Sequence, residues 1–328
     1  MKRAGQTLVT GGAGFIGSHL VERLLAEGKS VGVIDDLSTG SAKNLANVRS
    51  HPRLRWVQAS VSRCVELAEW VGEAETVYHL AATVGVDRVL ESPLRAIQTN
   101  LDETEAVLQA ASQHGAKVVL TSSSEVYGKS ERELLREDAD LNIGPPTVAR
   151  WSYACSKLMA EFLALSYARE RNLPVIIARL FNTVGPRQSG RYGMVLPRFL
   201  AAARSGQPLR VFGDGKQTRC FCDVADTVEA LLRLERCPEA PGQIVNVGGV
   251  VEISMLELAQ LITRTLRSTS TIEFVPYEEA YTAGFEDFPR RRPDLTKLKR
   301  LTGFLPAAEL GELIERLGAS FSSHCSSQ

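Results

Sequence analysis

Short apolar runs alternate with amphipathic segments along the first 180 residues of the chain. The apolar runs are rich in β-branched residues and fall at residues 7–11, 30–35, 54–60, 76–82, 117–123 and 174–180. Between several of them lie segments such as 18–28 and 103–115, where apolar residues recur every three or four positions, as in helices with one buried face. Strands that are apolar throughout and are separated by helices predict an α/β fold with a doubly wound parallel sheet covered on both faces.

The alternation stops near residue 184 and gives way to segments rich in glycine and proline, such as 185–199 and 212–219. This change predicts a second, smaller α/β lobe. We expect the sheet domain to comprise residues 1–183 with 222–251, and the smaller lobe to comprise 184–221 with 252–328.

The charge balance argues against a polyanionic partner. The chain has 38 basic and 38 acidic residues, so we expect neither nucleic acid nor a membrane surface as a partner. No apolar run is long enough to span a bilayer, and the first strand follows the start too closely for a signal peptide. Six cysteines in 328 residues do not resemble a disulfide framework, and the Cys220–Cys222 pair lacks the further ligands of a zinc site. We expect a soluble cytoplasmic protein without a bound metal.

The segment after the first predicted strand, TGGAGFIGSH, has a glycine spacing typical of dinucleotide binding. Gly11, Gly14 and Gly17 lie where the backbone turns tightly, approaches a pyrophosphate and packs helix against strand. Asp35 ends the second predicted strand 18 residues after Gly17. A carboxylate there accepts hydrogen bonds from the adenosine ribose and repels a 2′-phosphate, and Asp36 adds to this effect. The pattern predicts a Rossmann-type sheet that binds NAD rather than NADP.

Two further segments carry candidate catalytic groups. TSSSEVYG at 121–128 places hydroxyls and a carboxylate at the carboxyl end of the fifth predicted strand, facing the cofactor crevice. YACSK at 153–157 places Lys157 one helical turn after Tyr153. Beside a positively charged nicotinamide, the lysine would lower the pKa of the tyrosine, and Ser123 could share the substrate proton with it. The three side chains together predict a general base for oxidising an alcohol.

These motifs together resemble the extended short-chain dehydrogenase/reductase family, and within it the nucleotide-sugar epimerases, dehydratases and decarboxylases. The resemblance continues through ARLFNTVGPR (178–187), FGDGKQTRCFCDVAD (212–226), VNVGG (245–249) and PRRRPDLTKLKRLTGF (289–304). It implies a homodimer that uses NAD on a UDP-sugar. The cofactor contacts that it implies are Gly11, Gly14, Phe15, Ile16, Gly17, Asp35, Asp36, Leu80, Ala81, Ala82, Tyr153 and Lys157. The implied substrate contacts are Asn182, Arg191, Arg219 and Arg291.

One position departs from the family pattern. The family usually has an aspartate after the third strand that contacts the adenine, whereas this chain reads QASVS at 58–62. The resemblance therefore leaves the adenine contact at this point unassigned.

Two residues bear on the reaction that follows the first oxidation at C4 of the sugar. Glu125 lies in SEVYG, as in UDP-glucuronate decarboxylases, whereas simple 4-epimerases have a small or apolar residue there. Dehydratases of the family have an Asp–Glu pair where this chain has Ser124–Glu125. Arg291, in RRRPDL, matches an arginine that meets the uronate carboxylate or assists protonation. The resemblance thus implies catalytic roles for Ser123, Glu125, Tyr153, Lys157 and Arg291. The reaction that it favours first is decarboxylation of UDP-glucuronate to UDP-xylose, a UDP-pentose.

Three alternatives remain open at this point. A 4-epimerase acting on a UDP-hexose or UDP-uronate is the main one, and an NDP-hexose 4,6-dehydratase is less favoured. A non-catalytic NAD-binding regulator on the same fold is disfavoured because Ser123, Tyr153 and Lys157 are all present.

Overall fold

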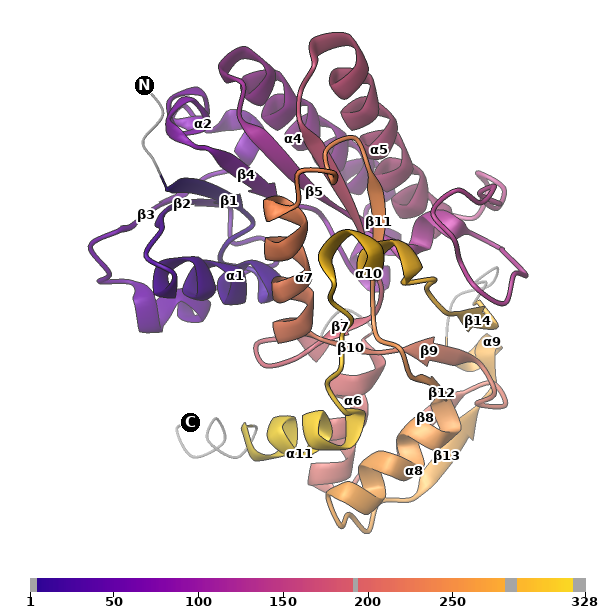
Figure 1. Ribbon diagram of the computed structural model, residues 1–328. Helices are drawn as coiled ribbons and strands as arrows, with labels where there is room; N and C mark the ends of the chain where they lie inside the picture. The colour runs from indigo at the N-terminus through magenta and orange to yellow at the C-terminus, as the bar shows by residue number, and fades with distance from the viewer. Residues whose placement is uncertain (1–4, 191–193, 281–287, 321–328) are drawn as a thin grey trace.

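The computed structural model describes residues 5–190, 194–280 and 288–320. A seven-stranded parallel sheet runs through the larger part of the molecule in the order β11-β6-β5-β4-β1-β2-β3 (Figure 1). Its strands are β1 (Gln6–Thr10), β2 (Ser30–Asp35), β3 (Leu54–Gln58), β4 (Thr76–His79), β5 (Lys117–Ser123), β6 (Val175–Leu180) and β11 (Ile244–Val247). The predicted α/β fold with a doubly wound parallel sheet is confirmed.

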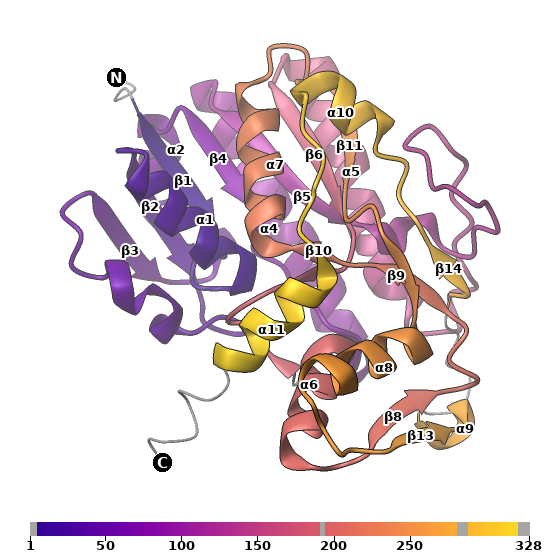
Figure 2. The ribbon, with the colours of Figure 1, turned by 60° about the horizontal axis from the view of Figure 1, so that its bottom comes forward.

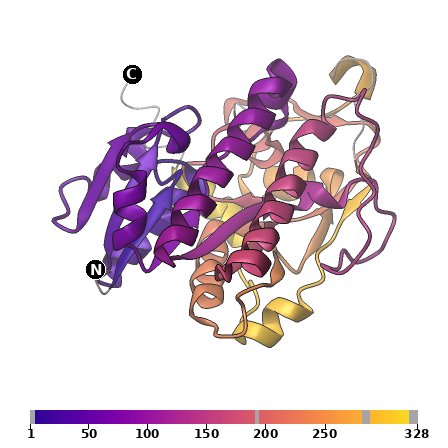
Figure 3. The same cartoon turned by 90° about the horizontal axis from the view of Figure 1, so that it is seen from above.

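Helices cover both faces of this sheet because alternate strand residues are apolar on each side. On one face Val9, Val33 and Val119 pack beneath α1 (Phe15–Ala26), α7 (Val224–Arg236) and α10 (Thr296–Thr302). On the other face Leu8, Ile34 and Leu120 pack beneath further helices. These are α2 (Leu67–Glu73), α4 (Pro93–His114) and α5 (Trp151–Arg171). Figure 3 shows α4 and α5 lying side by side along the outside of the sheet.

The order in which successive strands are added to the sheet reverses at β1, and this switch point locates the ligand crevice. From β1 the chain proceeds outward through β2 and β3, and then returns to place β4 on the other side of β1. Helices on either side of such a switch point diverge and leave a crevice at the carboxyl ends of the strands.

A smaller region covers the carboxyl ends of the large sheet (Figure 2). It contains three short sheets. Two of them have two strands each, β7 (Thr183–Val184) with β10 (Cys222–Asp223), and β8 (Leu209–Phe212) with β13 (Ile272–Val275). The third has three strands in the order β12 (Glu252–Ser254), β9 (Thr218–Cys220) and β14 (Arg290–Arg291). Helices α6 (Val195–Ser205), α8 (Met255–Thr265) and α11 (Leu310–Ser320) enclose a separate apolar core here. The remaining elements are α3 (Val86–Glu91), α9 (Tyr277–Ala280) and the 3-10 turns η1 (Ala42–Val48), η2 (Val61–Arg63) and η3 (Ser124–Tyr127).

The last part of the chain contacts both cores. Leu295 and Leu298 pack into the core of the large sheet, whereas Leu313 and Leu317 of α11 pack into the core of the smaller region. Among the described residues, no helix is both long and apolar enough to cross a bilayer.

Candidate active site

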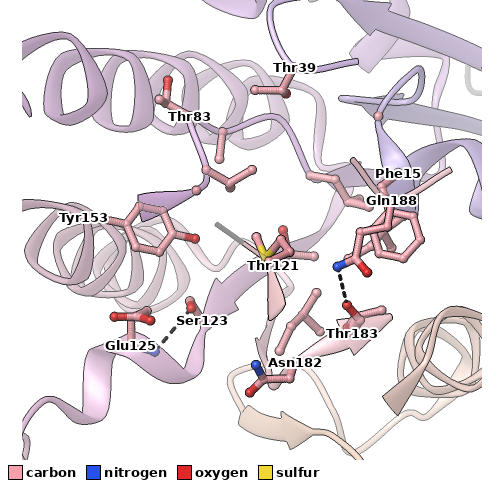
Figure 4. Close-up of a pocket in the computed structure, with 18 of the residues that line it drawn as sticks. Phe15, Thr39, Thr83, Thr121, Ser123, Glu125, Tyr153, Asn182, Thr183 and Gln188 are labelled. Atoms are coloured by element: carbon pink, nitrogen blue, oxygen red, sulfur yellow. Dashed lines mark hydrogen bonds between the residues drawn. The ribbon is translucent and has the colours of Figure 1, made fainter. Parts of the chain in front are cut away.

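A cavity lies between the carboxyl ends of the large-sheet strands and the smaller region (Figure 4). Its wall includes residues from the β1–α1 turn, the ends of β2, β4 and β5, and helix α5. From the smaller region it receives Arg219 of β9 and Arg291 of β14. Except for Arg191, every site residue predicted from the sequence lines this one cavity. Arg191 lies outside the described residues.

The glycine turn after β1 has the close backbone approach expected of a dinucleotide cradle. Gly11 has a φ of 71°, and a Cβ there would lie 2.7 Å from the amide nitrogen of Ala81. A Cβ on Gly17 would lie 2.1 Å from the carbonyl oxygen of Gly11, which fixes how closely α1 packs on the turn. A side chain at either position would displace the backbone, so both positions require glycine. The tight turn places the start of α1 at the cavity, where its backbone amides can bind an anionic ligand.

Asp35 stands at the end of β2 with its carboxylate held in place by main-chain amides. Its Oδ2 accepts from the nitrogen of Ala13 at 2.9 Å, and its Oδ1 accepts from the nitrogen of Leu37 at 2.8 Å. Burial raises the pKa of Asp35, and the backbone hydrogen bonds oppose that rise. Each carboxylate oxygen can accept a second bond, so Asp35 retains capacity for a ribose hydroxyl. Asp36, which is exposed, accepts from the nitrogen of Ser38 at 2.8 Å.

The glycine turn and Asp35, both predicted from the sequence, therefore form a site that fits NAD. Apolar side chains complete the wall around it, and they come from the start of α1 and from the chain just after β4. These are Phe15, Ile16, Leu80, Ala81 and Ala82.

Tyr153, Ser123 and Lys157 come together at the end of β5. The Tyr153 hydroxyl points into the cavity beside Ser123 (Figure 4). Ser123 Oγ accepts from the backbone nitrogen of Glu125 at 3.2 Å. Lys157 Nζ donates to the carbonyl oxygen of Thr121 at 3.0 Å, which ties helix α5 to strand β5. The spacing of Tyr153 and Lys157 on one helix thus places both at a single strand end.

The charge state of Tyr153 differs from the sequence-based expectation. Burial raises the pKa of Tyr153, and the nearby Glu125 carboxylate raises it further, while Ser123 and Arg291 act in the opposite direction. The expected lowering of this pKa therefore does not come from the residues of the chain alone. Burial dominates because a phenolate loses its hydration when it is enclosed.

Lys157 is also buried, and burial lowers its pKa to about 8, against the effects of Glu161 and Glu103. An ammonium group with a pKa this low is still mostly protonated at pH 7. It titrates at a mildly alkaline pH.

Glu125 and Arg291 form an ion pair across the two parts of the molecule. Arg291 Nη2 lies 2.6 Å from Glu125 Oε1, and Arg150 Nη2 lies 3.5 Å from Glu125 Oε2. The guanidinium carbon of Arg291 lies 3.7 Å from the ring centroid of Phe288, and that of Arg150 lies 4.4 Å from it. Burial raises the pKa of Glu125, but Arg291 and Arg150 outweigh it and leave the pKa below its ordinary value. The carboxylate is therefore ionised at neutral pH.

The predicted substrate contacts face the same space. The Oδ1 atom of Asn182 is buried and has no hydrogen-bond partner among the described residues. Arg219 is buried beside Arg291 on the neighbouring strand, and its Nη1 donates to the carbonyl oxygen of Phe288 at 2.9 Å. A buried acceptor and a buried cation at the cavity wall are suited to a polar, anionic ligand.

The sequence analysis missed four charged residues of the cavity wall, which are Glu103, Arg150, Arg198 and Arg210. Arg150 and Glu103 are 6% and 5% exposed, and both line the cavity. Arg150 lies one turn before Tyr153, a spacing that could have indicated it. Glu103 sits in the predicted helix at 103–115 among ordinary polar residues, and only the packing of α4 against the loop after β3 brings it to the cavity.

Comparison with known proteins places these features in context. A family model described as the NAD dependent epimerase/dehydratase family matches residues 7–248. The UDP-N-acetyl-alpha-D-glucosaminuronate decarboxylase of Bacillus cytotoxicus is 43% identical over 300 residues, covering 91% of this chain and 92% of that protein. UDP-glucuronic acid decarboxylase 2 of Arabidopsis thaliana is 40% identical over 94% of this chain, which spans 67% of the plant protein.

A solved structure matches the whole architecture. The UDP-glucuronic acid 4-epimerase of Bacillus cereus, in complex with UDP-glucuronic acid and NAD, superimposes with a TM-score of 0.88 at 25% identity. The match covers 97% of this chain and 99% of that one.

Proposed function

Because the chain belongs to the NAD dependent epimerase/dehydratase family, we propose that it removes CO₂ from a nucleotide-linked uronic acid, with UDP-glucuronate as the first candidate and a UDP-pentose as the product. The cluster Arg150–Glu125–Arg291 is the observation that carries this proposal. Two arginines share one carboxylate there, so the cluster has a net positive charge where a substrate carboxylate would lie. The curated relatives at 43% and 40% identity are decarboxylases of uronic acids.

The first step assigns roles to the Tyr153 group. Tyr153 takes the proton from O4 of the sugar, and Ser123 hydrogen-bonds the same oxygen. NAD, when bound, accepts the hydride from C4 and later returns it. Lys157, held against β5 by the carbonyl of Thr121, keeps its positive charge near Tyr153 and thereby favours the phenolate.

The second step uses the arginine cluster. Oxidation at C4 makes the substrate a β-keto acid, so the C5–C6 bond breaks and its electrons pass to the C4 oxygen as CO₂ leaves. A proton from a solvent water then adds at C5, and the enolate becomes the ketone. Because Glu125 is ionised at neutral pH, we assign it the role of orienting the proton donor together with Arg291. The ketone is finally reduced at C4, and Tyr153 returns its proton to O4.

Asn182 and Arg219 are proposed to hold the nucleotide part of the substrate. Arg219 presents a planar guanidinium suited to the pyrophosphate, and Asn182 offers an acceptor for a sugar or base donor. Arg191 is also proposed as a substrate contact, by the family resemblance. The Bacillus cytotoxicus relative acts on a sugar with an N-acetyl group, so both sugar types belong in the test.

Epimerisation at C4 is the second candidate, and the similarity to the Bacillus cereus 4-epimerase favours it. Mass spectrometry separates the two reactions. The purified protein is incubated with UDP-glucuronate and, separately, with UDP-N-acetylglucosaminuronate and UDP-glucose. Loss of CO₂ from a uronate supports decarboxylation, whereas a product of unchanged mass and altered chromatographic mobility contradicts it and indicates epimerisation.

We also propose that two copies of the chain associate through α4 and α5. Leu94 on α4 is 67% exposed, and Met159 and Phe162 on α5 are 50% and 60% exposed. Large apolar side chains gathered on one exposed pair of helices are typical of an interface.

The low cysteine content, six in 328 residues, supports a cytoplasmic location.

A further inference from the structure

Glu103 is a buried carboxylate at the cofactor cavity that the proposed reaction does not use. It projects from α4, is 5% exposed, and lines the same cavity as Asp35 and Asp36 at the end of β2. Ser60, in the loop after β3, donates its hydroxyl to Glu103 Oε1 at 3.1 Å. The backbone amide of Val61 acts on the same carboxylate and lowers its pKa. The hydroxyl of Ser60 therefore ties the carboxylate to this loop at the edge of the cavity.

The start of the loop after β3 has no carboxylate of its own. Position 60 is serine, and the stretch QASVS at 58–62 contains no carboxylate. The structure brings a carboxylate to this loop from a different element, because Ser60 donates a hydrogen bond to Glu103 of α4. The negative charge is thus present, but it is carried by a helix instead of the loop.

We propose that Glu103 recognises the adenine ring of NAD by accepting a hydrogen bond from its exocyclic amino group. Asp35 is placed for the adenosine ribose at the end of β2, and β3 is the strand next to β2. The loop that follows β3 therefore lies on the adenine side of the ribose, and Glu103 is bound to that loop.

The carboxylate has both the capacity and the charge for this role. A carboxylate can accept about four hydrogen bonds, and Ser60 takes one of these positions. Burial raises the pKa of Glu103 to about 6, with Asp36 and Asp35 adding to the rise and Ser60 and Val61 opposing it. Lys157 on α5 has an attractive electrostatic interaction with Glu103. At neutral pH the group is therefore mainly ionised, and an ionised carboxylate accepts from the amino group and repels a carbonyl oxygen at the same position.

A competition between two dinucleotides tests this directly. Nicotinamide hypoxanthine dinucleotide carries a carbonyl oxygen where NAD carries the amino group. The protein is incubated with equal excess concentrations of both until the bound ratio is constant, the free dinucleotides are removed, and the bound ones are quantified by mass spectrometry. The ratio is measured within one sample, so partial unfolding of a variant does not alter it.

We expect the wild-type protein to prefer NAD by about tenfold or more, as for one hydrogen bond to a charged group. Glu103→Ala should bring the ratio close to one. Glu103→Gln should also reduce it, because an amide can donate to the carbonyl of hypoxanthine. Glu69→Gln, which changes an exposed carboxylate on the adjacent helix α2, should keep the wild-type ratio.

An unchanged preference in both Glu103 variants would overturn the proposal, as would a wild-type protein that binds the two dinucleotides equally. Since the readout is the bound dinucleotide, the result is independent of which sugar reaction the enzyme performs.

Discussion

Burial governs the charge of the titratable side chains around the catalytic hydroxyls. It raises the pKa of Tyr153 and lowers that of Lys157, so each is pushed toward its neutral form. Glu125 is the exception, because Arg291 and Arg150 hold its pKa below the ordinary value. The site thus contains one firmly ionised carboxylate and two groups whose charges depend on their neighbours and on pH.

Tyr153→Phe removes the only atom of this side chain that can take the O4 proton. Loss of a general base lowers turnover by about 10² to 10⁴-fold. The rate of UDP-pentose formation is measured by mass spectrometry, together with the NAD content of the variant, which should match the wild type. Tyr167→Phe on the same helix is the matched control, because its ring is partly buried against the core beneath α5. Substantial turnover by Tyr153→Phe would contradict its assignment as the base.

The pKa of Lys157 near 8 predicts an alkaline limit to activity. Lys157 carries its charge below that pH and loses it above, and the charged form is the one that favours the phenolate. We therefore expect kcat to fall about tenfold per pH unit above pH 8. In Lys157→Arg the guanidinium does not titrate in this range, so its lower rate should show no such fall. A wild-type rate that stays constant well above pH 8 would contradict the role of the charge.

Glu125→Ala distinguishes decarboxylation from epimerisation at the level of a single side chain. The variant leaves Arg150 and Arg291 without their shared carboxylate, so Arg291 alone remains to orient the donor at C5. We expect steady-state CO₂ release to fall by about 10² or more because each turnover needs that protonation, while reduction of bound NAD by the substrate continues and is followed by its absorbance.

Glu131→Gln, at an exposed position six residues along the chain, is the control for a change of charge. If Glu125→Ala released CO₂ at the wild-type rate, Glu125 would have no part in the decarboxylation.

At the scale of elements, a buried ion pair holds α5 in register with the strands that it covers. Glu161 lies one turn after Lys157 on α5, and Arg179 of β6 binds it through two nitrogens at 2.9 and 2.7 Å. Ser122 of β5 donates to Glu161 Oε1 at 2.5 Å. Since Lys157 binds the adjacent residue Thr121, the pair fixes the helix that carries Tyr153 against the strand that carries Ser123.

Removing one partner of the Glu161–Arg179 pair should lower the free energy of unfolding. Arg179→Met leaves the carboxylate of Glu161 buried without its cation, which costs about 3 to 5 kcal/mol. The double variant Glu161→Leu with Arg179→Met removes both charges and should recover part of that loss. Urea unfolding followed by circular dichroism gives the midpoints. A double variant less stable than Arg179→Met alone would show that the pair, and not the isolated charge, supplies the stability.

The elements that sequence predicts well are those whose burial follows a local pattern. The runs at 30–35 and 117–123 coincide with β2 and β5, because each is enclosed by helices along its whole length. The run at 76–82 is too long by three residues, since Leu80, Ala81 and Ala82 line the cavity and are apolar for that reason. β11 joins the sheet at its edge from residues far along the chain, and no local pattern marks it as the neighbour of β6.

The same distinction applies to the site. Residues in motifs, such as Gly11, Ser123 and Tyr153, could be predicted because their spacing reflects one local turn or one helix. Glu103 could not, because its partner Ser60 lies 43 residues away. The position of Arg150 one turn before Tyr153 could have indicated it, but its pairing with Glu125, 25 residues away, could not be predicted. Such contacts depend on tertiary packing.

At the scale of the whole molecule, the catalytic cavity depends on both cores. Arg291 and Arg219 lie on adjacent strands of a small sheet, whereas Glu125 and Tyr153 belong to elements packed on the large one. The Glu125–Arg291 pair therefore joins the two parts directly at the place of reaction. Helices α4 and α5 lie on the outer face of the large sheet, and α5 carries Tyr153 (Figure 3). An interface on these helices would thus support the helix that positions the base.

Phe162→Lys tests that interface. The side chain is 60% exposed on α5, and placing a charge there would bury an unpaired cation if two copies met along α4 and α5. We expect the wild-type protein to have the mass of a dimer by light scattering after gel filtration, and the variant to have the mass of a monomer. Phe274→Lys, at a residue 52% exposed on β13 in the smaller region, is the matched control and should remain a dimer. If Phe162→Lys kept the wild-type mass while Phe274→Lys lost it, the contact between copies would lie on the smaller region instead.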